Sequence, residues 1–244
     1  MIAKILKIIY NIIVKESEAK MMVFKPFSSQ ISIFLSDGIM NPSRVTADIN
    51  KMLSKISWKE NYSLNLEDAP NDMPLVRYSS NDGKYIYDFA KKRINFYLNF
   101  NNEDNMDLFE TYKDSIKSML YEVILKYSNI SRVGIAVNYY VEKKDDKYSF
   151  WVKKYNLPFY DSDATSEVTY TINNNFINKG LKYNNIIILS NGKINDTKVV
   201  PVISTDINNL PTAIMSNESI EYIFNEIDRY KKEYIEDFLE KDSK

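Results

Sequence analysis

The sequence predicts an α+β protein made of duplicated β-α-β-β-β-α-like units, whose antiparallel sheet or sheets pack against two long helices. Residues 93–100 alternate apolar and polar side chains, which is the period of a half-buried strand. Segments 105–127 and 216–239 instead repeat apolar residues at helical spacing. Each of these two segments follows three predicted strands, and this recurrence indicates an internal duplication.

The first half of the chain contains the clearest element signals. We expect strands at 22–35, 74–79, 84–89 and 93–100, and helices at 43–56 and 105–127. Asn41-Pro-Ser43 is typical of a helix start, because a small polar residue caps the first turn. Ser80-Asn-Asp-Gly83 is typical of a tight hairpin turn.

The second half repeats this order more loosely. We expect a hairpin of strands 131–141 and 148–152, an irregular passage around Pro158, strands 167–178, 185–190 and 198–204, and a final helix at 216–239. Asn191-Gly192 predicts a hairpin turn. The domain organisation is then an amphipathic N-terminal helix (1–20), a first α+β half (21–128) and a second α+β half (129–244) packed on the first.

Residues 1–20 form a separate amphipathic pattern. Lys4, Lys7 and Lys15 lie at helical spacing beside an isoleucine-rich face. The apolar run is too short to span a bilayer, so we expect this helix to pack on the domain or on a partner and not to contact a membrane. Met21 or Met22 is an alternative natural start, since the first strand begins there.

Two absent residue types restrict the chemistry. The 244 residues include no cysteine and no histidine, which excludes disulfides, thiolate metal sites, cysteine nucleophiles and serine hydrolases of the usual type. The five glycines are isolated, so no phosphate-binding loop is present and we expect no cofactor. Lys+Arg 32 against Asp+Glu 33 leaves no global field that would favour a polyanion.

Two short motifs indicate a relationship. Arg132-Val-Gly134 opens a predicted strand after a helix, and Asp206-Ile-Asn208 lies in a strand before the last helix. In this order and length the chain resembles a sporadically distributed family of uncharacterised bacterial proteins. The resemblance assigns no activity. It implies a patchy distribution, of the kind associated with mobile elements and conflict between phage and host.

Basic and aromatic residues near two predicted strands form a candidate nucleic-acid site. Aromatic rings can stack on bases while the neighbouring cations hold phosphates. The alternative is that the aromatics form cross-strand pairs and the lysines keep sheet edges soluble. The candidate residues are Lys91, Lys92, Arg93, Tyr97, Trp151, Lys153 and Lys154.

Acidic residues give a weaker prediction. Glu142-x-Lys144 at a strand end matches half of the motif of metal-dependent nucleases, but the second carboxylate that magnesium needs is missing from a neighbouring strand. We therefore expect this segment to be a solvated hairpin turn. Asp161 and Asp163 are typical of a turn, and we expect no metal site.

These observations predict a cytoplasmic, non-catalytic protein that binds a macromolecule, namely another protein, in a bacterial or phage conflict of defence or anti-defence. The alternative is an RNA- or DNA-binding module that uses the basic-aromatic sheet face. A third reading is a metal-dependent nuclease around Glu142. The sequence leaves homo-oligomerisation open.

Overall fold

The computed structural model describes residues 23–38, 42–54, 57–64, 68–100, 106–142, 169–194, 198–212 and 214–230. These residues form one sheet of nine strands. The strands are β1 (Val23–Leu35), β2 (Trp58–Ser63), β3 (Val76–Ser80), β4 (Tyr85–Phe89), β5 (Arg93–Asn99), β6 (Ile130–Glu142), β7 (Thr169–Asn178), β8 (Leu181–Ile194) and β9 (Lys198–Asn209). The helices are α2 (Pro42–Met52), α3 (Met106–Glu122), the short 3-10 helix η1 (Ile124–Lys126) and α5 (Asn217–Tyr230).

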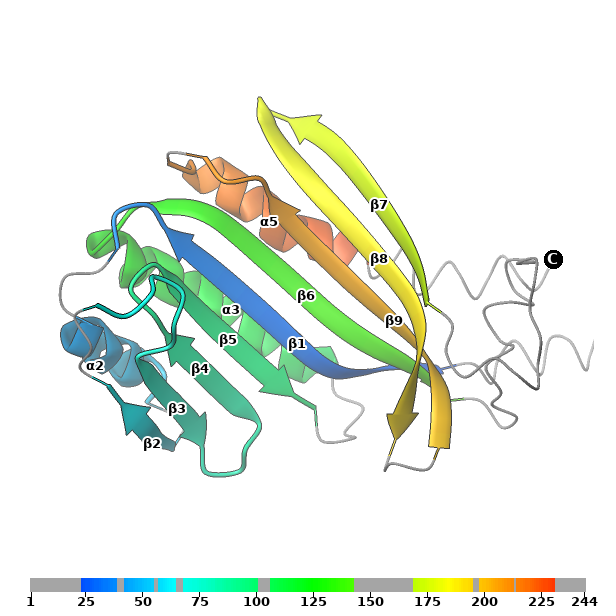
Figure 1. The fold of residues 1–244 in the computed structure, drawn as a ribbon, viewed down its shortest axis with the longest axis horizontal. Coiled ribbons are helices and arrows are strands. Elements are labelled where there is room, and N and C mark those ends of the chain that lie inside the picture. The colour runs from blue at the N-terminus through cyan, green and yellow to red at the C-terminus, as the bar shows by residue number, and fades with distance from the viewer. Residues whose placement is uncertain are drawn as a thin grey trace, which may run out of the picture.

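All neighbouring strands pair antiparallel, in the order β2-β3-β4-β5-β1-β6-β9-β8-β7. The two long strands β1 and β6 lie side by side in the middle of the sheet (Figure 1). β5 continues the sheet beyond β1, and β9 continues it beyond β6. The described part of the chain is therefore α+β, and its nine strands form one continuous antiparallel sheet.

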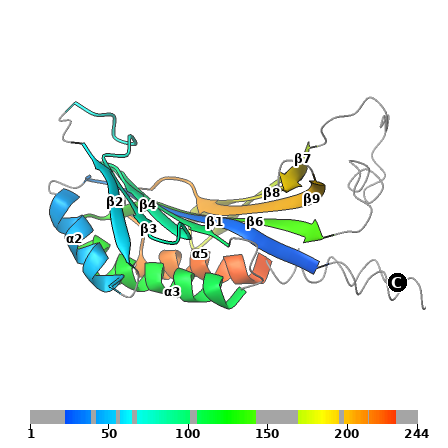
Figure 2. The same cartoon turned by 90° about the horizontal axis from the view of Figure 1, so that it is seen from below.

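The helices α2, α3 and α5 all lie against one face of this sheet, and no described helix covers the other face, which we call the open face (Figure 2). Strand alternation explains the difference. Ile31 and Ile33 of β1 and Ile94 and Phe96 of β5 are fully or almost fully buried and belong to one core cluster with residues of the three helices. Since alternate side chains point to opposite faces, the residues between them lie on the open face.

Most predicted elements in the described residues are confirmed, including the alternation of β5 and the strand at 22–35, and the helix predicted at 105–127 is present but ends at Glu122 and is followed by η1. The structure corrects three predictions. β2 was not predicted, because its residues 58–63 are mostly polar and exposed and lack an apolar period. The helix predicted at 43–56 ends at Met52. β8 runs to Ile194 without the turn predicted at Asn191-Gly192.

Gly192 is explained by close packing instead of a turn. It pairs with Val200 in the sheet, and a Cβ added to it would lie 2.9 Å from a methyl carbon of Val202. A separate hairpin turn, between β7 and β8, falls at Lys179 and Gly180, whose φ angles of 48° and 80° suit a tight two-residue turn.

Several predictions concern residues outside the described ranges. They are the N-terminal helix at 1–20, the strand at 148–152, the passage around Pro158 and the end of the last helix after Tyr230. Among the helices that the structure describes, none combines the length and the apolar character needed to cross a bilayer.

Candidate functional site

A single row of residues crosses the open face at one level on all nine strands. Each member lies directly opposite the next in the register of the sheet. All have polar side chains except a glycine in the middle. We call this set the polar row; from β2 to β7 it consists of Tyr62, Arg77, Asp88, Asn95, Ser32, Gly134, Asn208, Asn184 and Asn175.

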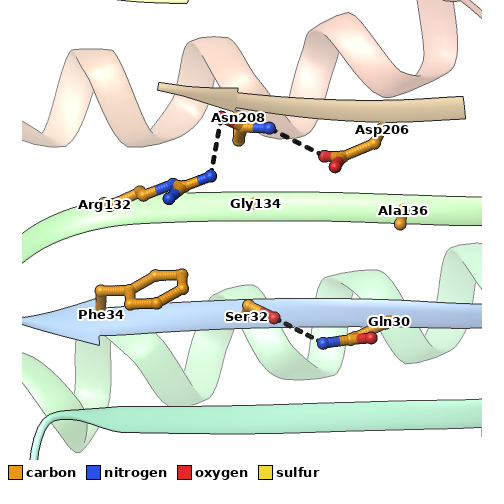
Figure 3. Close-up of a pocket in the computed structure, with 8 residues that line it drawn as sticks. All are labelled: Gln30, Ser32, Phe34, Arg132, Gly134, Ala136, Asp206 and Asn208. Carbon is orange, nitrogen blue, oxygen red and sulfur yellow. Dashed lines mark hydrogen bonds between the residues drawn. The ribbon is translucent and has the colours of Figure 1, made fainter. Parts of the chain in front are cut away.

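The centre of the open face is hollowed because β6 carries two small residues there. Gly134 and Ala136 form the floor, while longer side chains of β1 and β9 rise on either side (Figure 3). The hollow has a volume of about 130 Å³, enough for one side chain or a few waters. It is lined by Gln30, Ser32, Phe34, Arg132, Gly134, Ala136, Asp206 and Asn208.

Asn208 organises the β9 side of the hollow. Its side-chain oxygen accepts hydrogen bonds from Arg132 Nη2 at 3.0 Å and from Asn184 Nδ2 at 3.2 Å. Its amide nitrogen donates to Asp206 Oδ1 at 3.0 Å (Figure 3). Asn208 is only 2% exposed, so these bonds hold a buried amide in one orientation. The side chains around it are thereby positioned before any ligand arrives.

The β1 side is also connected by hydrogen bonds. Gln30 Nε2 donates to Ser32 Oγ at 2.9 Å, and Ser32 Oγ donates to Asn95 Oδ1 of β5 at 2.9 Å. Ser32 thus joins the hollow to the buried part of the polar row. The β1 side of the hollow thus offers an amide and a hydroxyl group, and the β9 side offers an amide and a carboxylate, so the hollow can donate and accept hydrogen bonds.

One end of the hollow is closed by an aromatic ring between two guanidinium groups. The Arg132 guanidinium lies 5.1 Å from the centre of the Phe34 ring, and the Arg93 guanidinium lies 5.9 Å from it. These are favourable cation–π distances. The Nε atoms of both arginines are buried and have no hydrogen-bond partner in the described structure. Arg132 is therefore held beside the hollow by the Phe34 ring and by its hydrogen bond to Asn208.

The polar row also contains an ion pair in which the carboxylate is buried. Arg77 Nε and Nη2 donate to the two carboxylate oxygens of Asp88 at 2.5 and 2.6 Å. The side chain of Asp88 is 3% exposed, whereas that of Arg77 is 39% exposed. The hydrogen bond with Asp88 raises the pKa of Arg77 above its ordinary value. This pair neutralises the charge of the row at β3 and β4.

The predicted basic site lies partly within the described structure. Its cluster at the turn between β4 and β5 donates to main-chain carbonyl oxygens: Lys91 to Ala69 (3.0 Å), Lys92 to Ser36 (3.4 Å) and Arg93 to Asp72 (3.1 Å). Tyr97 lies on the open face opposite Gln30, and burial raises its pKa. Trp151, Lys153 and Lys154 lie outside the described residues. The nucleic-acid assignment stays a prediction.

The acidic candidates are only partly placed. Glu142 is the last residue of β6, where its backbone lies opposite Val23. Asp161 and Asp163 lie outside the described residues. Within the ranges that the structure describes, no three acidic side chains gather closely enough to hold a metal ion.

The hollow brings together residues that the sequence presented as two separate motifs. Arg132 and Gly134 come from the first motif of the resemblance, and Asp206 and Asn208 come from the second. Local sequence patterns do not join these motifs, because their proximity depends on the pairing of β6 with β9. The polar residues at alternating positions of β1 and β5 were the available signal for an open face.

The sequence matches no protein-family model, and no curated protein matches it significantly. The resemblance noted above therefore stays a prediction, and function has to be inferred from the geometry of the open face.

Proposed function

We propose that this chain is a non-catalytic binding protein that recognises another protein through the open face of its sheet, centred on the hollow above Gly134. The observation that carries the proposal is the polar row, which crosses all nine strands on a face that no described helix covers. On a monomeric domain, an exposed sheet face usually carries charged side chains that are mobile in the solvent. Here the central amides and hydroxyls are fixed by hydrogen bonds, which favours binding because little side-chain entropy is lost.

The charge of this surface favours a protein over a nucleic acid. Within the polar row and the hollow, Arg77 and Arg132 are balanced by Asp88 and Asp206, and Arg93 beside Phe34 adds one positive charge. A surface that holds a phosphate backbone needs a clear excess of cations. A surface with a single excess charge and many donors and acceptors instead suits the mixed polar groups of a protein surface.

We further propose that the fold arose by duplication, with two long helices in matching positions. In support, β1 pairs with the last strand of its half and β6 pairs with the last strand of the other half. α3 follows the first of these last strands and α5 follows the second. The two first strands are antiparallel neighbours, as a twofold axis between them requires. The hollow then lies at the junction of the two halves.

The biological setting is part of the same proposal. The motifs at Arg132 and Asp206 resemble those of a sporadically distributed bacterial family, and a patchy distribution is typical of genes used in conflict between phage and host. We propose that the protein acts in the cytoplasm in defence or anti-defence, by occupying a surface of its partner.

Affinity capture from the native host tests this function. We expect the tagged wild-type chain to retain a protein partner after washing at high salt. The Gly134→Val variant should lose it, because the valine side chain fills the hollow. Ser79→Val is the matched control, since Ser79 lies on the open face of β3 away from the hollow. Both variants are first compared with the wild type by circular dichroism.

Other outcomes contradict the proposal. If nucleic acid is retained instead, with binding that falls steeply with salt and depends on Lys91 and Lys92, the alternative of a nucleic-acid module is correct. Magnesium-dependent cleavage that Glu142→Ala abolishes would establish the nuclease reading. Capture of the same protein by wild type and Gly134→Val alike would remove the hollow from the binding site.

A further inference from the structure

The two edges of the sheet differ in how they resist pairing with another strand. β2 is short, carries Lys59 and Glu60, and has a register shift between Glu60 and Tyr62. Charges and bulges of this kind protect an edge strand. β7, at the opposite edge, has ten residues and an uninterrupted register with β8. β7 therefore has neither of the protective features that β2 shows.

β7 is also uncharged. Its sequence, TYTINNNFIN, contains no acidic or basic residue and no proline. No strand of the described structure pairs with its outer side. Ile177 is 68% exposed and Tyr170 is 41% exposed. A long, uncharged edge with an uninterrupted register is a surface for the addition of a strand.

The residues of β7 are arranged almost symmetrically about Asn174. Asn173 and Asn175 flank it on one face of the sheet, and the apolar Ile172 and Phe176 stand two positions away on the other face. If two copies of β7 pair antiparallel about Asn174, each Ile172 lies opposite a Phe176 and each Asn173 lies opposite an Asn175. No like charges meet, so the strand is complementary to itself.

We propose that two copies of this chain associate by antiparallel pairing of β7 with β7 about a twofold axis at Asn174, which joins their sheets into one. The second copy is favoured over an unrelated strand because the strand's own pattern supplies each partner that pairing needs. Asn175 ends the polar row, and Asn173 of the second copy would lie next to it, so the polar surface continues across the dimer. This inference does not depend on the proposed protein partner.

The first test uses charge at positions 173 and 175, which oppose each other in the proposed dimer. Sedimentation equilibrium should give the wild-type chain twice its mass of 28.6 kDa. Asn173→Lys with Asn175→Lys places lysines opposite lysines and should raise the dimer dissociation constant by about tenfold or more. Asn173→Lys with Asn175→Glu changes the same positions but places opposite charges together, and should restore the dimer.

The second test uses the absence of natural cysteine. Asn174→Cys introduces a single thiol at the twofold axis, where paired Cα atoms lie about 4.5–5.5 Å apart, within the range of a disulfide. Mild oxidation should link two chains. Asn173→Cys is the control, because its copies lie on a diagonal of about 8 Å, too far for a disulfide.

Each outcome decides the inference. A monomeric wild-type chain overturns it, as does a dimer that tolerates the two lysines. If Asn173→Lys with Asn175→Glu fails to restore the dimer, the register about Asn174 is wrong. The same follows if oxidation links the Asn173→Cys chains in place of the Asn174→Cys chains. Circular dichroism of each variant shows that it is folded, so loss of the dimer cannot be mistaken for loss of the fold.

Discussion

The ion pair between Arg77 and Asp88 should make a measurable contribution to stability. Two unit charges about 4 Å apart attract by about 4 kcal/mol at an effective dielectric constant of about 20. Asp88 is buried, but Arg77 is 39% exposed, so water screens the pair and we reduce this value to about 2 kcal/mol. The two hydrogen bonds, at 2.5 and 2.6 Å, hold the two side chains in a bidentate geometry, so we expect the pair to contribute the whole of this reduced interaction energy.

A double-mutant cycle of Arg77→Met, Asp88→Asn and the double variant isolates this interaction. The free energy of unfolding of each protein is obtained from urea denaturation by linear extrapolation. We expect a coupling energy of about 2 kcal/mol that survives high salt, because the carboxylate is shielded from solvent. A coupling below about 0.5 kcal/mol would show that the pair behaves as an ordinary surface ion pair and would refute the reasoning.

Three further predictions concern the core and the sheet. Tyr112→Phe should stabilise the protein by about 1 kcal/mol, because the Tyr112 hydroxyl is buried without a hydrogen-bond partner in the described structure. Tyr87→Phe should destabilise it by about the same amount, because the Tyr87 hydroxyl donates a hydrogen bond to an asparagine at 2.5 Å. Equal urea midpoints for the two variants would contradict this prediction. Gly192→Ala should lower the free energy of unfolding by on the order of 1 kcal/mol, since the added Cβ would lie 2.9 Å from a valine methyl carbon. Gly134→Ala should lower it less in the same assay, because the nearest contact of its Cβ would be 3.4 Å. Burial raises the pKa of Tyr87 and Tyr112 above the ordinary value of 10.0, so these two hydroxyls ionise first in the unfolded state. The free energy of unfolding should therefore fall as pH rises above about 10, by about 1.4 kcal/mol per pH unit for each tyrosine. Unfolding free energies that stay constant from about pH 9 to about pH 11 would contradict this prediction.

Elements with a strong local period could be predicted from the sequence. The alternation of residues 93–100 and the apolar stripe of α3 both reflect burial against one face, so the sequence pattern follows the structure directly. β2 carries no such period because it is a polar edge strand. The Asn191-Gly192 prediction failed because the glycine is needed for close packing with Val202, a contact between strands that local sequence does not reveal.

The candidate site was less predictable than the fold. The polar row depends on the register of eight strand pairs, and none of these registers can be read from single-strand patterns. Arg132 and Asp206 were visible only as members of two short motifs. They lie beside the same hollow because the last strand of the second half returns to pair with β6.

The most direct test of the central claim is the dissociation constant of the captured protein for the wild-type chain and for Gly134→Val, with Ser79→Val as control. Binding at the hollow predicts that Gly134→Val weakens the affinity by about tenfold or more, which corresponds to about 1.4 kcal/mol, while the control binds like the wild type. Equal affinity of all three proteins would contradict recognition centred on the hollow.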